Sequence, residues 1–156
     1  MSNIIKLQYI STINTNKKEL WNSICTFQQL NDELLPVLKM TSPPKYNCIR
    51  FENFPIKSYV FVSAILLFRV IPIDRYYVRL MRVIPDSGFV EISKSIFTKK
   101  WIHIRKLEES SNCCTIIDKL EVVPRCIVFK PLIWLLIKSV FFTRHENLKS
   151  RFAIYP

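Results

Sequence analysis

The sequence predicts an α+β fold, in which a curved antiparallel sheet wraps around a long C-terminal helix and two short helices follow the first strand. Residues 131–152 have the periodicity of an amphipathic helix, and residues 46–123 are a series of β-rich segments joined by short turns. A helix of about 20 residues is roughly 30 Å long and needs an equally long apolar surface. We therefore expect residues 1–156 to form one domain built around this helix.

The long helix is predicted from Pro131 to Phe152. Proline suits the first turn of a helix, where its missing N–H breaks no hydrogen bond. Lys138, Glu146 and Lys149 fall on the side opposite the apolar face. The residues that share this face, at steps of three and four, are Trp134, Ile137, Phe141, His145, Leu148 and Phe152, flanked by Ile133 and Val140.

At the other end of the chain, residues 4–13 alternate loosely and predict a strand. The side chains of residues 14–16 can cap the helix expected over 17–27. A second helix, over 28–35, should end before Pro36, because the residue preceding a proline disfavours helical geometry. The expected order is thus strand, helix, helix.

The middle of the chain predicts an antiparallel meander. We expect Pro72 and Asp74 to interrupt it, and Asp86-Ser87-Gly88 to form a turn in which Gly88 adopts a positive φ. The predicted strands are Tyr46–Phe51, Tyr59–Arg69, Tyr76–Ile84, Phe89–Phe97, Lys100–Glu108 and Cys114–Val123.

The composition narrows the class of partner. Lys and Arg number 23 against 12 Asp and Glu, so the net charge is +11. This balance favours an anionic partner such as nucleic acid, an acidic membrane surface or a carboxylate ligand. Because the basic residues are scattered and form no nucleic-acid-binding module, we expect no nucleic acid, while peripheral membrane contact stays open. The single glycine, Gly88, excludes the glycine-rich phosphate loops.

Five cysteines and two histidines give no metal-binding pattern. The cysteine number is odd and no C-x-x-C pair occurs, so we predict neither a metal nor another cofactor. The chain begins without a signal-peptide pattern, and charges or prolines interrupt its apolar stretches before they reach the length of a membrane span. We therefore expect a cytoplasmic protein with reduced cysteines.

Two predicted strands place polar side chains together. Side chains two apart on a strand share a face, so Trp101, His103 and Arg105 lie together, as do Asp118 and Leu120 on the next strand. Across the hairpin, Asp118 can pair with Arg105 or accept from His103, and Glu91 can join from the preceding strand. Three interpretations stay open: an ion pair on a solvated face, a polar patch that orients a ligand, or acid/base catalysis by His103 with Asp118.

The C-terminal helix adds further candidates. His145 on its apolar face is either a core residue with satisfied hydrogen bonds or a ligand contact. Trp134 and Phe141 are expected in the core first and in a cavity wall second. Arg144 lies about 100° around the helix from His145 and can cap or pair at the sheet edge.

Several segments, in this order and spacing, resemble the SRPBCC superfamily, which includes START domains, the birch-pollen allergen family and polyketide cyclase-like proteins. They are Lys18–Trp21, Ala64–Phe68, Ile71–Asp74, Gly88–Glu91, Trp101–Arg105, Ile117–Leu120, Pro124–Arg125 and Phe141–His145. The resemblance is nearest to bacterial ligand-binding members of unassigned role.

The resemblance implies a helix-grip fold with an apolar cavity for a lipid, sterol, polyketide or similar molecule between sheet and helix. It supplies no catalytic set, and the chain departs from the pattern at Arg69, where a small residue is expected. The candidate ligand-binding residues are Glu91, Trp101, His103, Arg105, Asp118, Leu120, Trp134, Phe141 and His145.

Three functions stay open at this stage. The first is binding or transfer of a hydrophobic small molecule, which needs only a preformed cavity with a polar anchor. The second is a cyclase- or dehydrase-like enzyme acting on a polyketide-like substrate. The third is a membrane or protein interaction module whose cavity its own bulky side chains fill.

Overall fold

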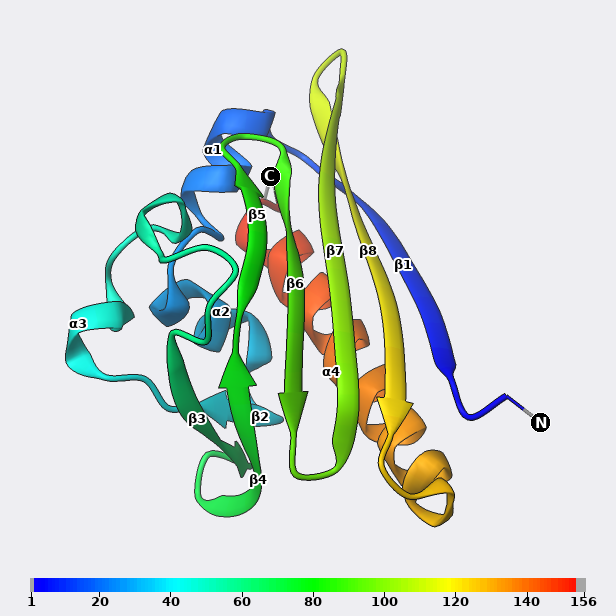
Figure 1. The fold of residues 1–156 in the computed structure, drawn as a ribbon. Helices are drawn as coiled ribbons and strands as arrows, with labels where there is room; N and C mark the ends of the chain where they lie inside the picture. Colours follow the sequence, from blue (N-terminus) through cyan, green and yellow to red (C-terminus); the bar gives the residue numbers. More distant parts are fainter. Residues whose placement is uncertain (1, 154–156) are drawn as a thin grey trace.

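A computed structural model describes residues 2–153 and shows a curved sheet closed on one side by helices (Figure 1). The chain forms β1 (Ile5–Ile13), α1 (Lys17–Asn22), α2 (Phe27–Leu34), β2 (Leu38–Met40), α3 (Pro44–Asn47), a 3-10 turn η1 (Phe51–Asn53), β3 (Phe61–Leu67), β4 (Ile71–Val78), β5 (Leu80–Ile84), β6 (Gly88–Ser95), β7 (Thr98–Ser110), β8 (Cys113–Pro124), a 3-10 turn η2 (Ile127–Phe129) and α4 (Lys130–Arg151). The predicted α+β helix-grip architecture is confirmed.

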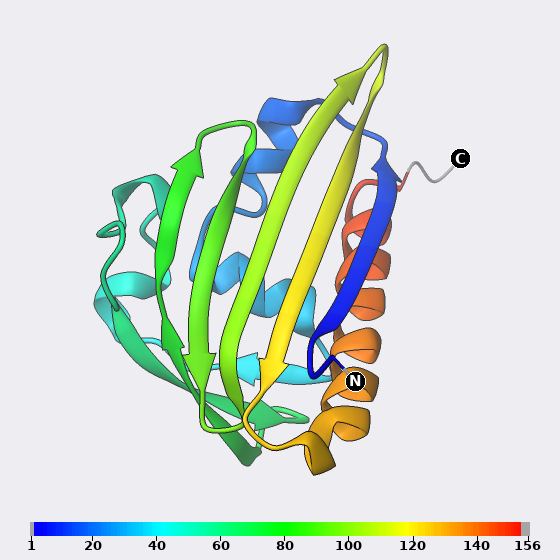
Figure 2. The ribbon, with the colours of Figure 1, turned by 45° about the vertical axis from the view of Figure 1, so that its right-hand side comes forward.

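The strands named above pair only in antiparallel fashion within residues 2–153. The sheet order is β1-β8-β7-β6-β4-β3-β2, and β5 also pairs with β6. The first strand therefore pairs with the last one and forms one edge of the sheet. The sheet curves around α4, and β1 runs beside this helix (Figure 2). This arrangement gives the long helix the apolar surface that its length requires.

The two helices after β1 start where their side chains provide caps. Asn16 Oδ1 accepts a hydrogen bond from the backbone N–H of Glu19 at 2.9 Å and begins α1. Thr26 and Gln29 form a reciprocal capping box at the start of α2. The second helix presents Phe27 and Leu34 to the interior, together with Glu33.

The turn before β6 forms as predicted, with Asp86 at φ 61° and Gly88 at φ 139°. A Cβ on Gly88 would lie 1.9 Å from the carbonyl oxygen of Arg105, so only glycine fits there.

Three predictions in the middle of the chain are wrong. Residues 46–51 form no strand; they end α3 and begin η1, because Pro44 starts a short helical turn. Pro72 and Asp74 do not interrupt the sheet but lie within β4, where a register shift opposite Ile65 and Leu66 accommodates the proline. Between Val78 and Leu80 the predicted strand over 76–84 breaks into two.

The apolar face of α4 is also partly different from the prediction. Ile137, Val140, Phe141, His145 and Leu148 are buried as expected, but Arg144 is buried among them. Trp134 is 40% exposed, so its placement in the core is wrong. Its indole instead lies under the ammonium group of Lys138, 4.8 Å from the ring centre, because the first turns of the helix extend beyond the sheet.

Candidate functional site

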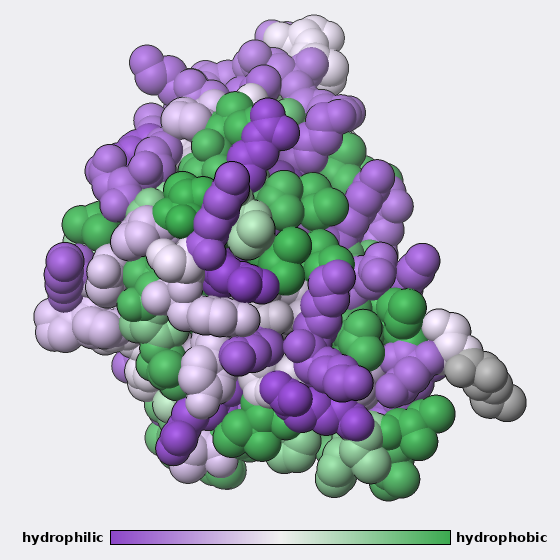
Figure 3. Space-filling model, in the orientation of Figure 1, coloured by the Kyte–Doolittle hydropathy of each residue, from purple (hydrophilic) through white to green (hydrophobic). Residues whose placement is uncertain are grey.

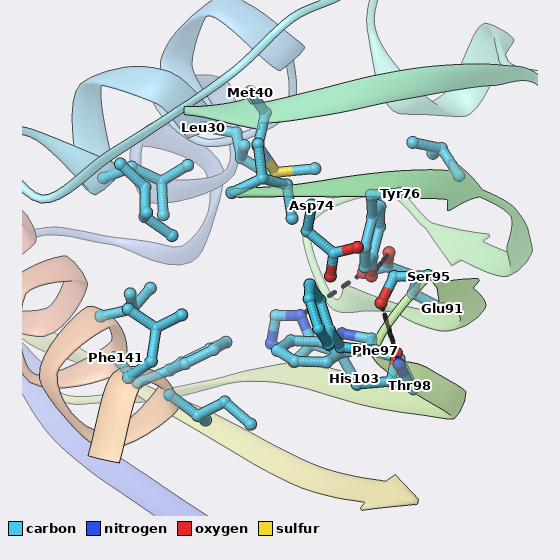
Figure 4. A pocket seen from close by; sticks show the side chains of 18 of the residues that line it. Leu30, Met40, Asp74, Tyr76, Glu91, Ser95, Phe97, Thr98, His103 and Phe141 are labelled. Carbon is cyan, nitrogen blue, oxygen red and sulfur yellow. Dashed lines mark hydrogen bonds and ion pairs between the residues drawn. The ribbon is translucent and has the colours of Figure 1, made fainter. Parts of the chain in front are cut away.

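A cavity of about 480 Å³ lies between the sheet, α2 and the first half of α4. Figure 4 shows Tyr76, Glu91 and His103 grouped on its sheet side, with Phe141 approaching from α4. Most of the wall is apolar, so the cavity can accept a hydrophobic molecule. The apolar wall includes Leu30, Leu34, Leu38, Met40, Ile65, Leu67, Val78, Trp101, Ile133, Leu136, Ile137, Val140 and Phe141.

The mouth of the cavity lies where three connections meet. Phe97 from the β6–β7 turn and Phe129 from η2 pack edge to face, with ring centres 5.4 Å apart, and both line the cavity. Leu132 from the first turn of α4 and Leu67 next to the β3–β4 turn complete this side. The cavity thus opens at the end of the sheet where η2 connects β8 to α4.

A hydrogen-bonded set of polar side chains interrupts the apolar wall on β4, β6 and β7. The hydroxyl of Tyr76 donates to Glu91 Oε1, which also accepts from the Ser93 hydroxyl at 2.8 Å. His103 Nδ1 lies 3.7 Å from Glu91 Oε2. The His103 ring is held edge to face between Phe89 and Phe141, with ring centres 5.2 and 5.1 Å away, so its orientation is fixed.

Behind this set lies a buried ion-pair network. Arg105 donates to both carboxylate oxygens of Asp118 at 2.8 Å, a bidentate geometry, and to Glu33 at 2.9 and 3.1 Å. His103 Nε2 lies 2.7 Å from Asp118 Oδ1. Asp118 and Glu33 are both 0% exposed, and therefore each needs these cations close by to stay ionised.

The long helix contributes two members of the network. Arg144 Nε donates to Glu33 Oε2 at 2.9 Å. His145 bridges Asp118 Oδ2, 2.8 Å from Nε2, and the Ser11 hydroxyl, 2.7 Å from Nδ1. We call the six residues Glu33, His103, Arg105, Asp118, Arg144 and His145 the polar floor.

The polar floor lies between the cavity and a filled part of the core, although Phe51, Phe54 and Phe89 of the same core cluster also line the cavity. Along β7, Trp101 lines the cavity, His103 and Arg105 belong to the floor, and Leu107 beyond them packs into the core. The same order holds along α4, from Phe141 in the cavity wall past the floor to the fully buried Leu148.

The charges of the network fix its protonation. Burial alone would raise the pKa of Asp118, but Arg105 and His103 outweigh it and hold that pKa well below its usual value. Burial also raises the pKa of Glu33, but the guanidinium groups of Arg105 and Arg144 lower it by more, so the Glu33 pKa is below its usual value. The pKa of Tyr76 rises well above normal because of burial and the neighbouring Glu91, so its phenol stays a hydrogen-bond donor.

Arg144 retains unused donors that face the cavity. Its side chain is only 6% exposed and lines the cavity wall. Within residues 2–153 its only side-chain hydrogen bond comes from Nε, so the two terminal nitrogens are without a partner. The guanidinium carbon lies 4.8 Å from the centre of the Phe141 ring, which helps to hold the group in place. A buried cation with free N–H groups is suited to a ligand carboxylate, phosphate or carbonyl.

The predicted pairing across the β7–β8 hairpin is confirmed, because Arg105 is the register partner of Asp118, and Glu91 is the partner of His103. The interpretation of this pairing as an ion pair on a solvated face is wrong, since both partners are almost completely buried. Of the nine candidate residues, Glu91, Trp101, His103 and Phe141 line the cavity, Arg105, Asp118, Leu120 and His145 are buried outside its wall, and Trp134 lies on the surface away from it.

Sequence reasoning missed Glu33 and Tyr76 and misplaced Arg144. Glu33 sits in a helix between Asp32 and Leu34, and a single carboxylate there is normally solvated. The spacing of the helix could have revealed its burial. Glu33 follows Phe27 and Leu30 at steps of three, so its carboxylate lies on the apolar face of α2 with Leu34. Arg144 carries the same signal, because it follows Ile137 and Phe141 at steps of four and three.

Comparison with known proteins identifies the family. Residues 11–152 match the family described as Domain of unknown function (DUF8410). The chain belongs to this family. No curated protein sequence matches it.

Solved structures of similar shape are far apart in sequence. A protein from Chromobacterium violaceum is 11% identical with a TM-score of 0.67, over 96% of this chain and 99% of that one. A START superfamily protein from Mycobacterium smegmatis is 6% identical with a TM-score of 0.65, over 94% and 96%. The ZhuI aromatase/cyclase from Streptomyces sp. R1128 is 6% identical with a TM-score of 0.66, over 95% and 93%. The expected SRPBCC-type fold is therefore confirmed.

Two further features of residues 2–153 bear on the site. These residues contain no group of three or more His, Cys, Asp or Glu side chains that could hold a metal ion. None of their helices combines the length and the apolar character needed to cross a membrane.

Proposed function

We propose that this protein binds a hydrophobic small molecule in the cavity, with a polar head group on Arg144. The cavity itself carries the proposal. Its volume of about 480 Å³ falls within the usual range of ligand pockets, about 300–1,000 Å³, and its wall is mostly Leu, Ile, Val, Met and aromatic side chains. The fold that this chain shares with a START superfamily protein and an aromatase/cyclase agrees with such a role.

The unused donors of Arg144 favour an amphipathic molecule over a purely apolar one. A ligand acceptor placed against these N–H groups would form a charge-assisted hydrogen bond, which is stronger than a bond between neutral groups. The Glu91 carboxylate is already occupied by Tyr76 and Ser93, so it is less available than Arg144 to a ligand. A lipid-like molecule with a carboxylate, or another acceptor at one end, fits this arrangement.

The contacts of His103 favour binding over the enzymatic alternative. Its Nε2 is hydrogen-bonded to Asp118 and its Nδ1 faces Glu91, so both ring nitrogens are directed at carboxylates of the protein. A general acid or base needs a nitrogen within hydrogen-bond reach of the substrate. The open cavity also argues against an interaction module with a filled interior.

Two matched probes test this proposal: laurate, which has a carboxylate, and dodecane, which has none. We expect calorimetry or native mass spectrometry to detect both, with laurate bound more tightly. Leu136 lines the cavity, whereas its neighbour Leu135 is 56% exposed. Leu136→Trp should therefore abolish binding of both probes, and Leu135→Trp should leave it unchanged. If Leu136→Trp binds the probes as the parent protein does, the cavity is not the site.

The head-group assignment has its own test. Arg144→Met keeps much of the side-chain length but removes the donors, so laurate affinity should fall about ten- to a hundred-fold, as expected for hydrogen bonds to a charged group. Dodecane affinity should stay the same. Lys138→Met, an exposed cation on the same helix, is the control. Equal affinities of laurate and dodecane for the parent protein would refute the anchor but leave the cavity proposal standing.

A further inference from the structure

Large apolar side chains gather on the surface at the open end of the sheet. They come from four stretches of chain: the β3–β4 turn, the β6–β7 turn, η2 and the first turns of α4, all at the lower end in Figure 1. Val70 and Val128 are the most exposed, at 72% and 75%. We call this set the apolar rim; its members are Phe68, Val70, Ile71, Ile96, Phe97, Ile127, Val128, Phe129, Leu132 and Leu135.

The rim surrounds the mouth of the cavity. Phe97, Phe129 and Leu132 belong both to the rim and to the cavity wall. Backbone contacts hold the separate stretches together: the N–H of Ile96 bonds to the carbonyl of Arg75 at 3.3 Å, and the N–H of Arg125 bonds to that of Phe97 at 2.9 Å. A surface that meets the rim therefore also meets the entrance to the site.

The charges around the rim are mainly positive, and the nearby carboxylate of Asp74 accepts a hydrogen bond from the backbone N–H of Ile96 at 3.0 Å. Residues 66–72, 95–100 and 124–135 contain Arg69, Lys99, Lys100, Arg125 and Lys130 but no Asp or Glu. In Figure 3, hydrophobic side chains gather along the lower edge of the molecule, and hydrophilic side chains lie directly above them. Apolar side chains interspersed with Lys and Arg match the boundary between acyl chains and anionic head groups in a membrane.

We propose that the apolar rim docks on the surface of an anionic lipid bilayer and presents the cavity mouth to it. Side chains on separate turns can each enter the interfacial region without a complementary partner surface. A symmetric contact between two copies through the rim would instead bring the same five cations of each copy together. This inference is independent of what the cavity holds.

Vesicle flotation of the full chain tests the proposal. We expect binding to vesicles of phosphatidylcholine with phosphatidylserine, weaker binding to phosphatidylcholine alone, and loss of the difference at high salt, because salt screens the surface charge. Val70→Asp with Val128→Asp should reduce binding by about tenfold or more, since both side chains would carry charge into the interface. Ile10→Asp is the control, because Ile10 is 59% exposed on β1, opposite Ile117 of β8 and outside the four stretches that form the rim.

The basic residues are tested separately. Arg69→Gln with Lys99→Gln should weaken binding to phosphatidylserine vesicles by on the order of ten- to thirty-fold. Lys6→Gln with Lys119→Gln, on exposed positions of the paired strands β1 and β8, makes the same change in net charge and should have little effect. Equal losses in the two double variants would show that only net charge matters and would refute a docking surface.

Two other results would also overturn the proposal. One is the lack of binding to any of these vesicles at low salt. The other is a dimer, detected by analytical ultracentrifugation, that Val128→Asp dissociates while Ile10→Asp does not, because the rim would then be covered by a second copy. Neither result affects the laurate and dodecane measurements, so the two proposals can fail separately.

Discussion

The two ends of the sheet are built from the same kinds of connection but carry opposite side chains. At the closed end, the β5–β6 and β7–β8 turns carry Asp86, Ser87, Ser110 and Asn112, and the buried Leu107, Cys114 and Ile116 fill the interior next to the β7–β8 turn. At the open end, the turns carry phenylalanine, valine and isoleucine, and the interior behind them is a cavity. Hairpin geometry does not require exposed apolar turns. The open end is therefore shaped for contact, whereas the closed end stabilises the fold.

The polar floor lies between the cavity and the filled part of the core, so disrupting it should have the largest effect on stability. Acid is the simplest means. The pKa values of Glu33, Glu91 and Asp118 are lower in the folded protein than in the unfolded chain. The unfolded state consequently binds more protons, and stability rises with pH. It is fully present above the unfolded carboxyl pKa values of about 4 and is lost as the pH falls through the lower folded values.

Urea unfolding at a series of pH values measures this dependence. The free energy of unfolding should be steady near neutral pH and decrease steeply in acid. Asp118→Asn should make the acid limb shallower, since one of the three carboxylates no longer titrates. A parent protein whose stability is independent of pH from neutral to strongly acidic solution would contradict the assignment of three ionised buried carboxylates.

Asp118→Ala should be the most damaging single substitution. It leaves Arg105 with one carboxylate partner and removes the acceptor shared by His103 and His145. Breaking a buried ion pair in this way typically lowers the free energy of unfolding by about 3–5 kcal/mol. Glu121→Ala, on the same strand at a half-exposed position, should change it little. Similar losses in both variants would mean that the polar floor has no special role in stability.

Substitutions of two leucines on α4 compare the filled part of the core with the cavity mouth. Leu148 is 0% exposed in the filled part of the core, so Leu148→Ala should lower the unfolding free energy by about 2–5 kcal/mol. Leu132 is 66% exposed at the cavity mouth, and Leu132→Ala should stay within about 0.5 kcal/mol. Chemical denaturation of both variants gives the comparison. A large loss at Leu132 would show that the open end also holds the fold together.

The smallest effect is expected at the turn residues with positive φ. At the closed end this conformation falls on Asp86 and Gly88, and at the open end Phe68 and Arg69 adopt φ of 49° and 70°. Non-glycine residues are strained there, so Arg69→Gly should raise the unfolding free energy by about 0.5–1 kcal/mol while weakening binding to phosphatidylserine vesicles. Thermal unfolding and flotation measure the two changes. A loss of stability would show that Arg69 makes contacts that outweigh its strain.

The parts of the site that depend on local periodicity could be predicted from the sequence. The alternation along 101–107 and 116–122 was enough to predict that Arg105 and His103 meet Asp118, because register partners on one face of a hairpin are neighbours. The burial of that group was not predictable in the same way. It depends on Glu33 and Arg144, which come from elements 111 positions apart in the chain.

Other elements escaped prediction for similar reasons. The strand β2 has three residues and exists only because β3 offers it an edge. The strand β4 includes Pro72 and Asp74, which local rules assign to a break. Ile73 between them is an extra residue opposite Ile65 and Leu66 of β3, and this register shift accommodates the proline. Trp134 has the right spacing for the core, but it lies on a part of α4 that the sheet does not reach.

The sequence by itself determined the order of the main elements, the amphipathic character of the last helix and the polar pairing across one hairpin, since each depends on residues close along the chain or on a simple period. The tertiary structure alone decided that the charges are buried, that a cavity stays open beside them, and that apolar turns from distant segments meet at its mouth. These properties arise from the packing of α2 and α4 against a curved sheet. This packing brings together residues that are far apart in the chain, so no local sequence pattern specifies it.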